Sequence, residues 1–503
     1  MSSVDGQPFS SATGDSTRRR LSRNLASLSA AAVVSKALTF AGALVVARIL
    51  GPRTLGPLAV AQTFAMGASM FADLGLTVVS MRDIVRRPRE LSRVVSITLA
   101  VQCTAALLLT AVLLVLAAVA PFPSGSGRLL VLSSPLLIVM ALSTVYALQG
   151  VEAMGLVALA RLLGVVITAV GMVVSVIVTG STAWVAVMSW VGLLAADAFA
   201  ITGLRRRHGL RLTGIRLAEC VALVHRATPF IVNGALAIAL MIVDTASLSL
   251  FGTATDVGIY GVGWSLSFGA AGILVLVTDA SFPEMVRRWH ESPRRLRQFS
   301  DEVISMLSRL TFAGAALVSM ESSGIVRLLL GSSFRGTATV LAILIWIVPV
   351  GAISMMHSFG MLASGAQKAL VRRRLIAVSF ALVSCPIAAV YGGPPEVALV
   401  ILGAHVLETS LFAIRNARTG SSSPLRPWLS QVDFLAIPLV ALLSLNLAWS
   451  TRPLPVAIVV WAIATLGAET RRGFSTARAL LAWRRSAVPV VPQEPSGAPP
   501  AGG

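Results

Sequence analysis

Two basic side chains, Lys36 and Arg309, lie inside long apolar stretches of the sequence. An ionisable group at the centre of a bilayer-spanning helix costs roughly 2.5–3.5 kcal/mol on insertion scales, so such a group is first suspected of a function. A cation held there could bind an anionic ligand. The structural alternative is a side chain that reaches the interface or pairs with an acid. Lys36 is the stronger candidate, because it is one of only two lysines in the chain.

Asp244 is the acidic counterpart with the most polar neighbourhood. Asn233, Ser247 and Ser249 lie in the same apolar stretch and form a polar strip with it. Such a strip could contact hydroxyl groups of a ligand or a coupling cation. It could equally form hydrogen bonds between helices.

Other polar groups in apolar stretches have weaker claims to a function. We expect Asp73 and Asp279 to bond to neighbouring helices and stabilise the bundle. Glu408 could pair with one of the buried cations. We expect His357 and His405 to be hydrogen-bonded interior histidines rather than proton carriers.

The composition shows which elements must position these groups. Hydrophobic residues make up 56% of the 503, and charged residues only 12%. The mean hydropathy is +0.84. Val94 to Gly127 and Leu162 to Ala196 contain no charge. Backbone groups that face lipid must be paired within their own segment, so the sequence predicts an all-α integral membrane protein.

We predict about fourteen transmembrane helices, each roughly 20 residues long. Gly, Pro and Ser clusters divide the longer apolar stretches, for example at residues 179–182. The predicted spans are 25–47, 55–80, 94–120, 129–150, 156–178, 183–203, 228–250, 257–282, 303–323, 337–363, 375–391, 396–414, 433–450 and 454–470.

Positive charge is distributed unevenly between alternate loops. With these spans, 33 of the 41 Lys and Arg residues lie on the side that carries both termini, and 6 lie on the other side. This bias places both termini in the cytoplasm of a cell (inner) membrane protein. The net charge of +20 therefore indicates topology and not a nucleic-acid partner, because it forms no basic domain.

A weak internal repeat suggests two lobes. Leu50–Gly56 follows the first span, and Phe251–Gly258 follows the seventh. Six spans separate the copies, so the axis relating two six-helix lobes would run along the membrane normal. The predicted organisation is a disordered tail (1–22), a first lobe (23–203), a basic amphipathic cytoplasmic linker (204–227), a second lobe (228–418), an extra helix pair with a basic end (419–485) and a disordered tail (486–503).

Several other functions are not indicated. The three cysteines are widely separated and predict no disulfide framework. We expect no metal site, no cofactor and no removable signal peptide, because neither ligand spacing nor an N-terminal apolar segment is present.

Short motifs occur in the order and spacing of a known family. They are ARILGPRTLG at 47–56, FADLG at 71–75, Arg82-Asp83, Thr228-Pro229, GIYG at 258–261, Phe282-Pro283 and Leu330-Gly331. Over roughly residues 20 to 420 the chain resembles the polysaccharide transporter (O-antigen flippase) family of the multidrug/oligosaccharidyl-lipid/polysaccharide exporter superfamily. Pro57-Leu58 departs from the family pattern, which has an aromatic residue there, so that turn can pack differently.

The resemblance implies two lobes with alternating access. It also implies export of an undecaprenyl-diphosphate-linked oligosaccharide from the inner to the outer leaflet. The expected partners are this substrate, membrane lipids, and the polysaccharide polymerase and chain-length machinery. The last two spans resemble an additional pair that could form a lipid-facing groove.

The resemblance also suggests roles for the candidate residues. Substrate contacts would come from Lys36, Arg309, Asn233 and, at the outer mouth, Arg48 and Arg53. A coupling ion or polar cavity would use Asp244, Asp73, Asp279 or Glu408.

Two alternatives to a flippase stay open. A cation-coupled multidrug antiporter of the same superfamily would often carry an acid in the first helix, where this chain has Lys36. A membrane glycosyltransferase or polymerase needs acidic groups for general acid–base catalysis. The acids of the short outer loops, Asp256 and Glu396, are isolated, which favours a transporter and not an enzyme.

Overall fold

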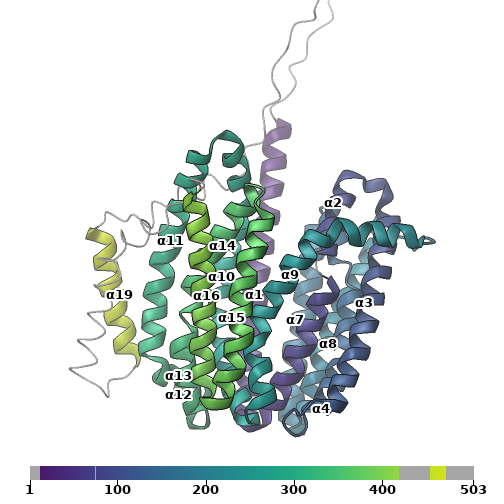
Figure 1. Ribbon diagram of the computed structural model, residues 1–503. Helices are drawn as coiled ribbons and strands as arrows, with labels where there is room; N and C mark the ends of the chain where they lie inside the picture. Colours follow the sequence, from purple (N-terminus) through teal and green to yellow (C-terminus); the bar gives the residue numbers. More distant parts are fainter. Residues whose placement is uncertain (1–11, 74, 419–453, 472–503) are drawn as a thin grey trace, which may run out of the picture. The chain divides into compact units, whose positions relative to one another are not determined.

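The computed structural model describes residues 12–73, 75–418 and 454–471. Helices are the only regular elements among these residues, which confirms the all-α prediction (Figure 1). The predicted thirteenth span (433–450) and the predicted tail 486–503 lie outside the described residues.

The first helix, α1 (Ala12–Asp73), covers the first predicted span and most of the second. It bends at Gly51, whose φ of 73° and ψ of 167° are not helical. Glycine adopts such angles at little cost, and the following Pro52 has no amide hydrogen to bond. The helix starts at Ala12, so residues 12–22, predicted as part of a disordered tail, are helical: no Gly or Pro separates Arg18 from the first span.

The next helices follow the predicted third to sixth spans. After α2 (Leu76–Arg86) and the short η1 (Pro88–Glu90), α3 runs over Leu91–Val119. The fourth span consists of α4 (Ser126–Ser133), α5 (Pro135–Ala141) and α6 (Val145–Gly150). α7 (Met154–Thr179) and α8 (Thr182–His208) meet at the predicted turn, where the Ser181 hydroxyl accepts a hydrogen bond from the Ala183 amide (3.2 Å).

The linker between the predicted lobes differs from the expectation. Residues 209–216 are not helical, and α9 (Leu217–Phe251) joins the predicted amphipathic segment to the seventh span in one helix. Leu217, Val221 and Val224 are nevertheless exposed on it, with fractions of 81%, 60% and 39%. These apolar side chains keep the amphipathic character that the sequence predicts.

The remaining elements complete the bundle. They are α10 (Ala254–Glu291), α11 (Pro293–Met320), α12 (Ser322–Leu330), η2 (Ser332–Phe334), α13 (Arg335–Leu344), α14 (Ile347–Ala363), α15 (Gln367–Tyr391), α16 (Pro394–Arg418) and α19 (Leu454–Arg471).

Ten helical stretches of the described residues are long and apolar enough to cross a membrane. One of them, Val34–Arg86, has 53 residues. At about 1.5 Å per residue it would be far longer than the roughly 30 Å of a hydrocarbon core, which fits two crossings separated at Gly51. A multi-pass membrane protein is therefore confirmed, whereas the count of fourteen stays a prediction.

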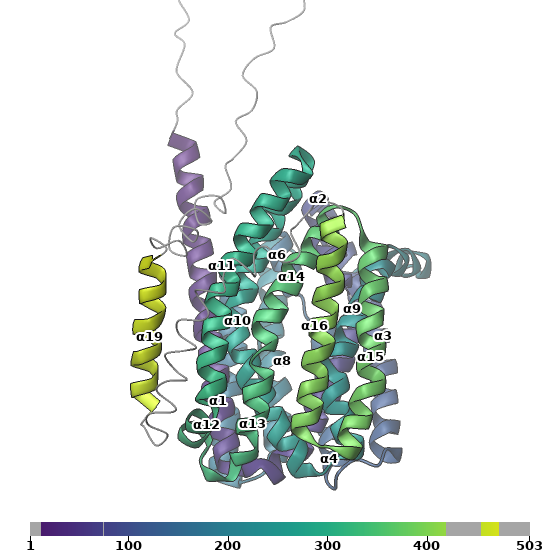
Figure 2. The ribbon, with the colours of Figure 1, turned by 60° about the vertical axis from the view of Figure 1, so that its left-hand side comes forward.

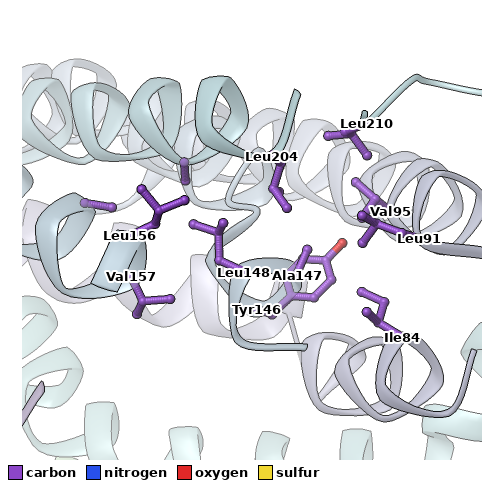
Figure 3. Packing of buried hydrophobic residues seen from close by; sticks show 12 residues of the cluster. Ile84, Leu91, Val95, Tyr146, Ala147, Leu148, Leu156, Val157, Leu204 and Leu210 are labelled. Carbon is purple, nitrogen blue, oxygen red and sulfur yellow. The ribbon is translucent and has the colours of Figure 1, made fainter. Parts of the chain in front are cut away.

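The contacts divide the chain into two compact units. The first comprises Met1–Ala270, Ser322–Leu344 and Arg374–Ala404. One of its apolar clusters joins α2, α3, α6, α7 and α8 around Leu148 and Val157, both fully buried (Figure 3). The second comprises Ala271–Glu321, Ile345–Arg373 and His405–Gly503. In it α11 and α14 lie side by side around buried Ile304 and Ile353 (Figure 2). The predicted lobes and their axis stay a prediction.

Candidate functional site

A small cavity in the first unit lies against the face of α1. Its volume is about 140 Å³, and its only polar side chains are those of Gln62 and Ser265. It is lined by Phe40, Ala43, Leu44, Val46, Ala47, Leu55, Leu58, Ala59, Gln62, Met172, Val185, Gly258, Gly261, Val262, Ser265 and Leu266. Since α1, α7, α8 and α10 all contribute, this face of α1 points into the bundle.

Lys36 extends this lining face by one helical turn. It precedes Phe40 by four residues, Ala43 by seven and Ala47 by eleven, and residues at these spacings share one side of a helix. Its side chain is exposed, and no hydrogen bond or ion pair holds it to the described residues. The structure therefore places an ammonium group with no partner among the described residues in line with the cavity.

Arg48 and Arg53 flank the bend of α1 at Gly51. Both side chains are exposed, and neither has an ion-pair partner among the residues with described positions. Arg48 follows the lining residue Ala47, and Arg53 lies two residues before the lining residue Leu55, so both arginines flank the part of the cavity beside the bend.

Two glycines bring the backbones of α1 and α10 into direct contact beside this bend. A Cβ atom on Gly56 would lie 1.8 Å from the Ala254 carbonyl oxygen, and one on Gly258 would lie 1.9 Å from the Pro52 carbonyl oxygen. The backbones of α1 and α10 thus touch directly, and no side chain fits between them. The contact joins the two segments of the weak internal repeat, because the glycine of each segment lies against a backbone carbonyl of the other.

Asn233 accepts a hydrogen bond from an arginine of a predicted cytoplasmic loop. The Arg374 guanidinium donates a hydrogen bond from Nη1 to Asn233 Oδ1 (2.9 Å), which joins α15 to α9. Arg374 belongs to a run of three arginines, and nothing in the sequence distinguishes it from the other two. Only the packing of α15 against α9 brings it to Asn233.

Asp244 is fully buried and fully bonded. The Tyr260 hydroxyl donates to its Oδ2 (2.6 Å), and the Thr245 amide donates to its Oδ1 (2.5 Å). Ser247 and Ser249 donate instead to backbone carbonyls one turn earlier on α9 (both 2.6 Å). Asp244 therefore links α9 to α10, while the serines of the predicted strip are satisfied by their own helix.

Asp73 has the helix-to-helix bond that the sequence predicts. Gln102 Nε2 of α3 donates to its Oδ1 (2.8 Å), and the Thr77 hydroxyl of α2 donates to its Oδ2 (3.1 Å). The backbone of Asp279 is helical, but its side chain lies outside what the structure describes.

In the second unit, Arg309 and Glu408 each form a hydrogen bond with a serine. Arg309 donates from Nη2 to the Ser305 hydroxyl one turn earlier on α11 (3.0 Å). Glu408 is buried on α16 and accepts a hydrogen bond from the Ser354 hydroxyl of α14 (3.2 Å). His357 is 1% exposed, and the Asn416 amide nitrogen lies 3.3 Å from its Nδ1, as expected for a hydrogen-bonded interior histidine.

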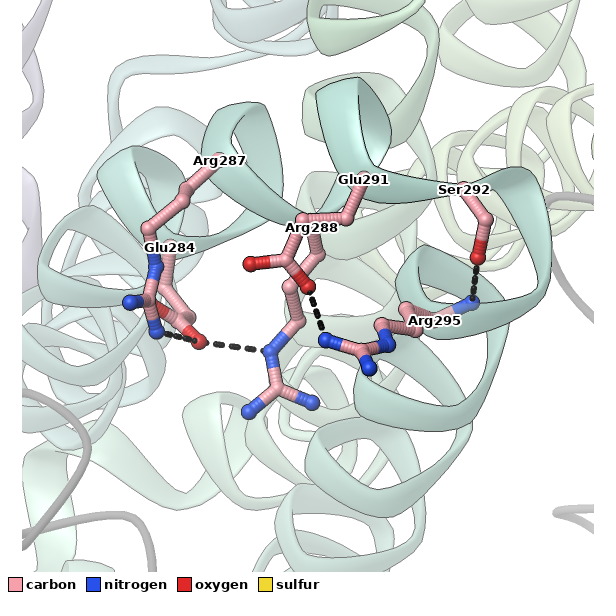
Figure 4. A network of polar contacts seen from close by, with 6 residues as sticks. All are labelled: Glu284, Arg287, Arg288, Glu291, Ser292 and Arg295. Carbon is pink, nitrogen blue, oxygen red and sulfur yellow. Dashed lines mark hydrogen bonds and ion pairs between the residues drawn. The ribbon is translucent and has the colours of Figure 1, made fainter.

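A basic cluster near the end of α10 consists of residues that the sequence predicts only as loop charges. Glu284 accepts hydrogen bonds from Arg287 (2.8 and 2.9 Å) and Arg288 (2.5 Å) (Figure 4). Burial by itself raises the pKa of Glu284, but these bonds outweigh burial and hold its pKa below the ordinary value. The cluster therefore carries a net positive charge at neutral pH.

Asp197 of α8 is a buried acid that is not among the candidate residues predicted from the sequence. It is 1% exposed, and neither carboxylate oxygen has a partner within 3.5 Å among the described groups. The Ser143 hydroxyl, in the break between α5 and α6, favours the charged form of this carboxyl group. Asp197 lies inside the predicted span 183–203, so the rule that singles out acids in apolar stretches, such as Asp73, applies to it as well.

We expect Asp197→Asn to stabilise the protein by about 1–3 kcal/mol at pH 8, because the neutral amide removes a buried charge without a partner. The measurement is the midpoint of thermal unfolding of the purified protein in detergent. Asp244→Asn is the matched control and should lower the midpoint, because an amide cannot accept both hydrogen bonds of Asp244. A lower midpoint for Asp197→Asn would contradict this prediction.

Comparison with known proteins identifies the family. The sequence profile described as polysaccharide biosynthesis protein matches residues 21–289, which is more than half of the chain. The chain belongs to this family. The resemblance predicted from the short motifs is thereby confirmed. No curated protein matches the chain.

Solved structures show the same fold. A lipid II flippase MurJ in an inward closed conformation is similar with a TM-score of 0.73 at 12% identity, over 88% of this chain and 98% of that chain. A multidrug resistance MATE transporter of the MOP superfamily, in an inward-facing conformation, gives 0.58 at 16% identity, over 77% and 94%. A mutant of the Vibrio cholerae MATE transporter VcmN gives 0.56 at 15% identity, over 80% and 98%. The family member described here therefore has a membrane-transporter fold.

Proposed function

We propose that this protein is a flippase. It would move an undecaprenyl-diphosphate-linked oligosaccharide, or a similar polyprenyl-linked glycan, from the inner to the outer leaflet by alternating access. The observation that carries the proposal is the position of Lys36 on the cavity-lining face of α1, with no described partner for its charge.

The physical argument concerns the charge of the cargo. A diphosphate headgroup crossing hydrocarbon without help would lose hydration worth tens of kcal/mol by Born estimates. A cation beside a hydrated path replaces part of that hydration. An ammonium group without an ion-pair partner can do so without first breaking a salt bridge.

The other basic residues extend this path in the proposal. Arg48 and Arg53 are exposed on either side of the bend of α1, and in the proposal they would receive the diphosphate as it leaves. Arg309 and Asn233 would contact the diphosphate or the sugars, Asn233 together with Arg374. At about 140 Å³ the cavity is too small for an oligosaccharide, so the helices that line it must move apart during transport.

The acids are proposed as a coupling-ion site or polar cavity. Asp244 is the strongest candidate, because it is fully buried where α9 meets α10, and movement of one helix relative to the other would disturb its bond to Tyr260. The bonds of Asp73 to α2 and α3 favour a structural role for that residue. Asp279 and Glu408 keep the same proposed coupling role.

The setting completes the proposal. Both termini would be cytoplasmic in an inner-membrane protein, and the partners would be membrane lipids and the polymerase and chain-length machinery. A cation-coupled drug antiporter is the alternative, favoured by the MATE-like fold. Lys36 argues against it, because an ammonium group repels cationic drugs and attracts phosphate.

Loss of the protein should make lipid-linked oligosaccharide accumulate in the inner leaflet of the producing cell. The measurement is radiolabelling of the lipid-linked intermediates, with leaflet position read by accessibility to an added enzyme that cannot cross the membrane. Re-expression of the intact chain is the control. A block in sugar transfer would instead indicate a glycosyltransferase, and unchanged intermediates with increased drug sensitivity would indicate the antiporter.

A further inference from the structure

A second cavity of the first unit lies where α2, η1 and α3 meet the start of α9. Its volume is about 520 Å³, in the range of roughly 300–1,000 Å³ that holds small ligands. It is lined by Ser80, Asp83, Arg86, Arg87, Glu90, Arg93, Val94, Ile97, Thr98, Glu219, Ala222, Leu223 and Arg226.

The charges of this cavity leave one cation unmatched. Its four arginines face three carboxylates. Arg226 pairs with Asp83 (2.8 Å), Arg93 pairs with Glu219, and Arg87 pairs with Glu90 (3.6 Å). Arg86 makes no ion pair with any residue whose position is described. The pairs hold three guanidinium groups in place around the cavity, and Arg86 supplies its net positive charge.

The start of α9 places the cavity relative to a membrane. Leu217, Val221 and Val224 occupy one side of the helix at helical spacing and are exposed, which is favourable only against acyl chains. Glu219, Leu223 and Arg226 of the same turns face the cavity, and Leu223 packs on Leu76 and Val79 of α2. The apolar stripe and the cavity lie on opposite sides of the same turns of α9, so the cavity is level with the membrane surface that the stripe contacts, at the depth of lipid headgroups.

We propose that this cavity binds the phosphate headgroup of an anionic membrane phospholipid. Arg86 bonds the phosphate oxygens, with Arg93 and Arg226 beside it, and an acyl chain lies along the apolar lining residues Ile97 and Leu223. Basic pockets between helices at the interface select anionic headgroups through charge-assisted hydrogen bonds. This site is separate from the cavity beside Lys36, so it does not depend on the proposed flippase function.

The test is lipid binding to the purified full-length protein in a neutral detergent, measured by native mass spectrometry. The probes are dioctanoyl phosphatidylglycerol, dioctanoyl phosphatidylcholine and inorganic diphosphate. We expect saturable binding of phosphatidylglycerol and a much weaker response to the other two. Arg86→Gln should weaken phosphatidylglycerol binding about tenfold, the loss of roughly one charge-assisted contact.

Arg89→Gln is the matched control. Arg89 is an exposed arginine three residues further along the chain that does not line the cavity, so its replacement removes the same charge and should leave binding within twofold. Ile97→Ser, which places a hydroxyl on the apolar part of the lining, should weaken the binding of phosphatidylglycerol and leave that of diphosphate unchanged. Neither replacement of arginine breaks an ion pair of the described structure, so both variants should fold.

Three results would overturn the proposal. Equal binding of phosphatidylcholine would show that the negative headgroup is not recognised. Equal effects of Arg86→Gln and Arg89→Gln would show that only the overall charge matters. Diphosphate binding as tight as that of phosphatidylglycerol would assign the cavity to a phosphate group of another origin, such as a lipid-linked diphosphate.

Discussion

Replacing Lys36 with alanine should abolish complementation of a flippase-null strain while the amount of protein in the membrane stays unchanged. The ammonium group has no described partner, so its removal breaks no structural bond and even lowers the cost of inserting α1. A lost charge-assisted contact to phosphate is worth about 1.5–3 kcal/mol, which corresponds to a roughly ten- to hundredfold slower transport. The measurements are complementation by polysaccharide production and membrane abundance by immunoblotting.

The chain provides its own control for this experiment. Lys368, the second of the two lysines, is exposed at the start of α15, and Lys368→Ala should leave complementation unchanged. Lys36→Arg retains the charge and should retain part of the activity. Full complementation by Lys36→Ala would remove this residue from the transport path and with it the main support for the proposed function.

The second large effect is expected at the contact between α1 and α10. In Gly258→Ala the new Cβ would lie 1.9 Å from the Pro52 carbonyl oxygen, so the two backbones must separate. Gly56→Ala should act in the same way through the Ala254 carbonyl oxygen, because the contact is reciprocal. If transport requires that this end of the cavity closes, both variants should lose at least about 90% of it, since even 1.4 kcal/mol is a factor of ten.

Spin labels can measure the separation directly. Ile49 and Phe251 are 49% and 52% exposed, and labels on cysteines at these positions should lie further apart in Gly258→Ala. The three native cysteines must first be replaced. Gly351→Ala in α14 is the matched control, because nothing lies within 4 Å of the added Cβ. Unchanged label distances together with normal transport in Gly258→Ala would show that this contact is not a gate.

Much of the candidate site follows from residue types alone. An apolar stretch interrupted by Lys36 already marks a group that must face something other than lipid, and the spacing of Asp73 in its span predicts a bond to a neighbouring helix. Asp197 also lies inside a predicted span, but only the packing of α8 shows that neither of its carboxylate oxygens has a hydrogen-bond partner among the described groups. Arg374 escaped notice because a positive charge in a loop and a positive charge bonded to Asn233 have the same sequence signature.

The sequence by itself determined that the chain is helical, spans a membrane repeatedly and belongs to a transporter family, because apolar length and motif order are local properties of the chain. Only the tertiary structure decided that Gly56 and Gly258 touch opposite backbones and that Asp244 bonds to Tyr260. It also decided that four arginines, from α2, the residue that follows it, α3 and α9, share one cavity with three acids. These facts depend on distances between helices far apart in the chain, and a single sequence does not encode those distances in any local pattern.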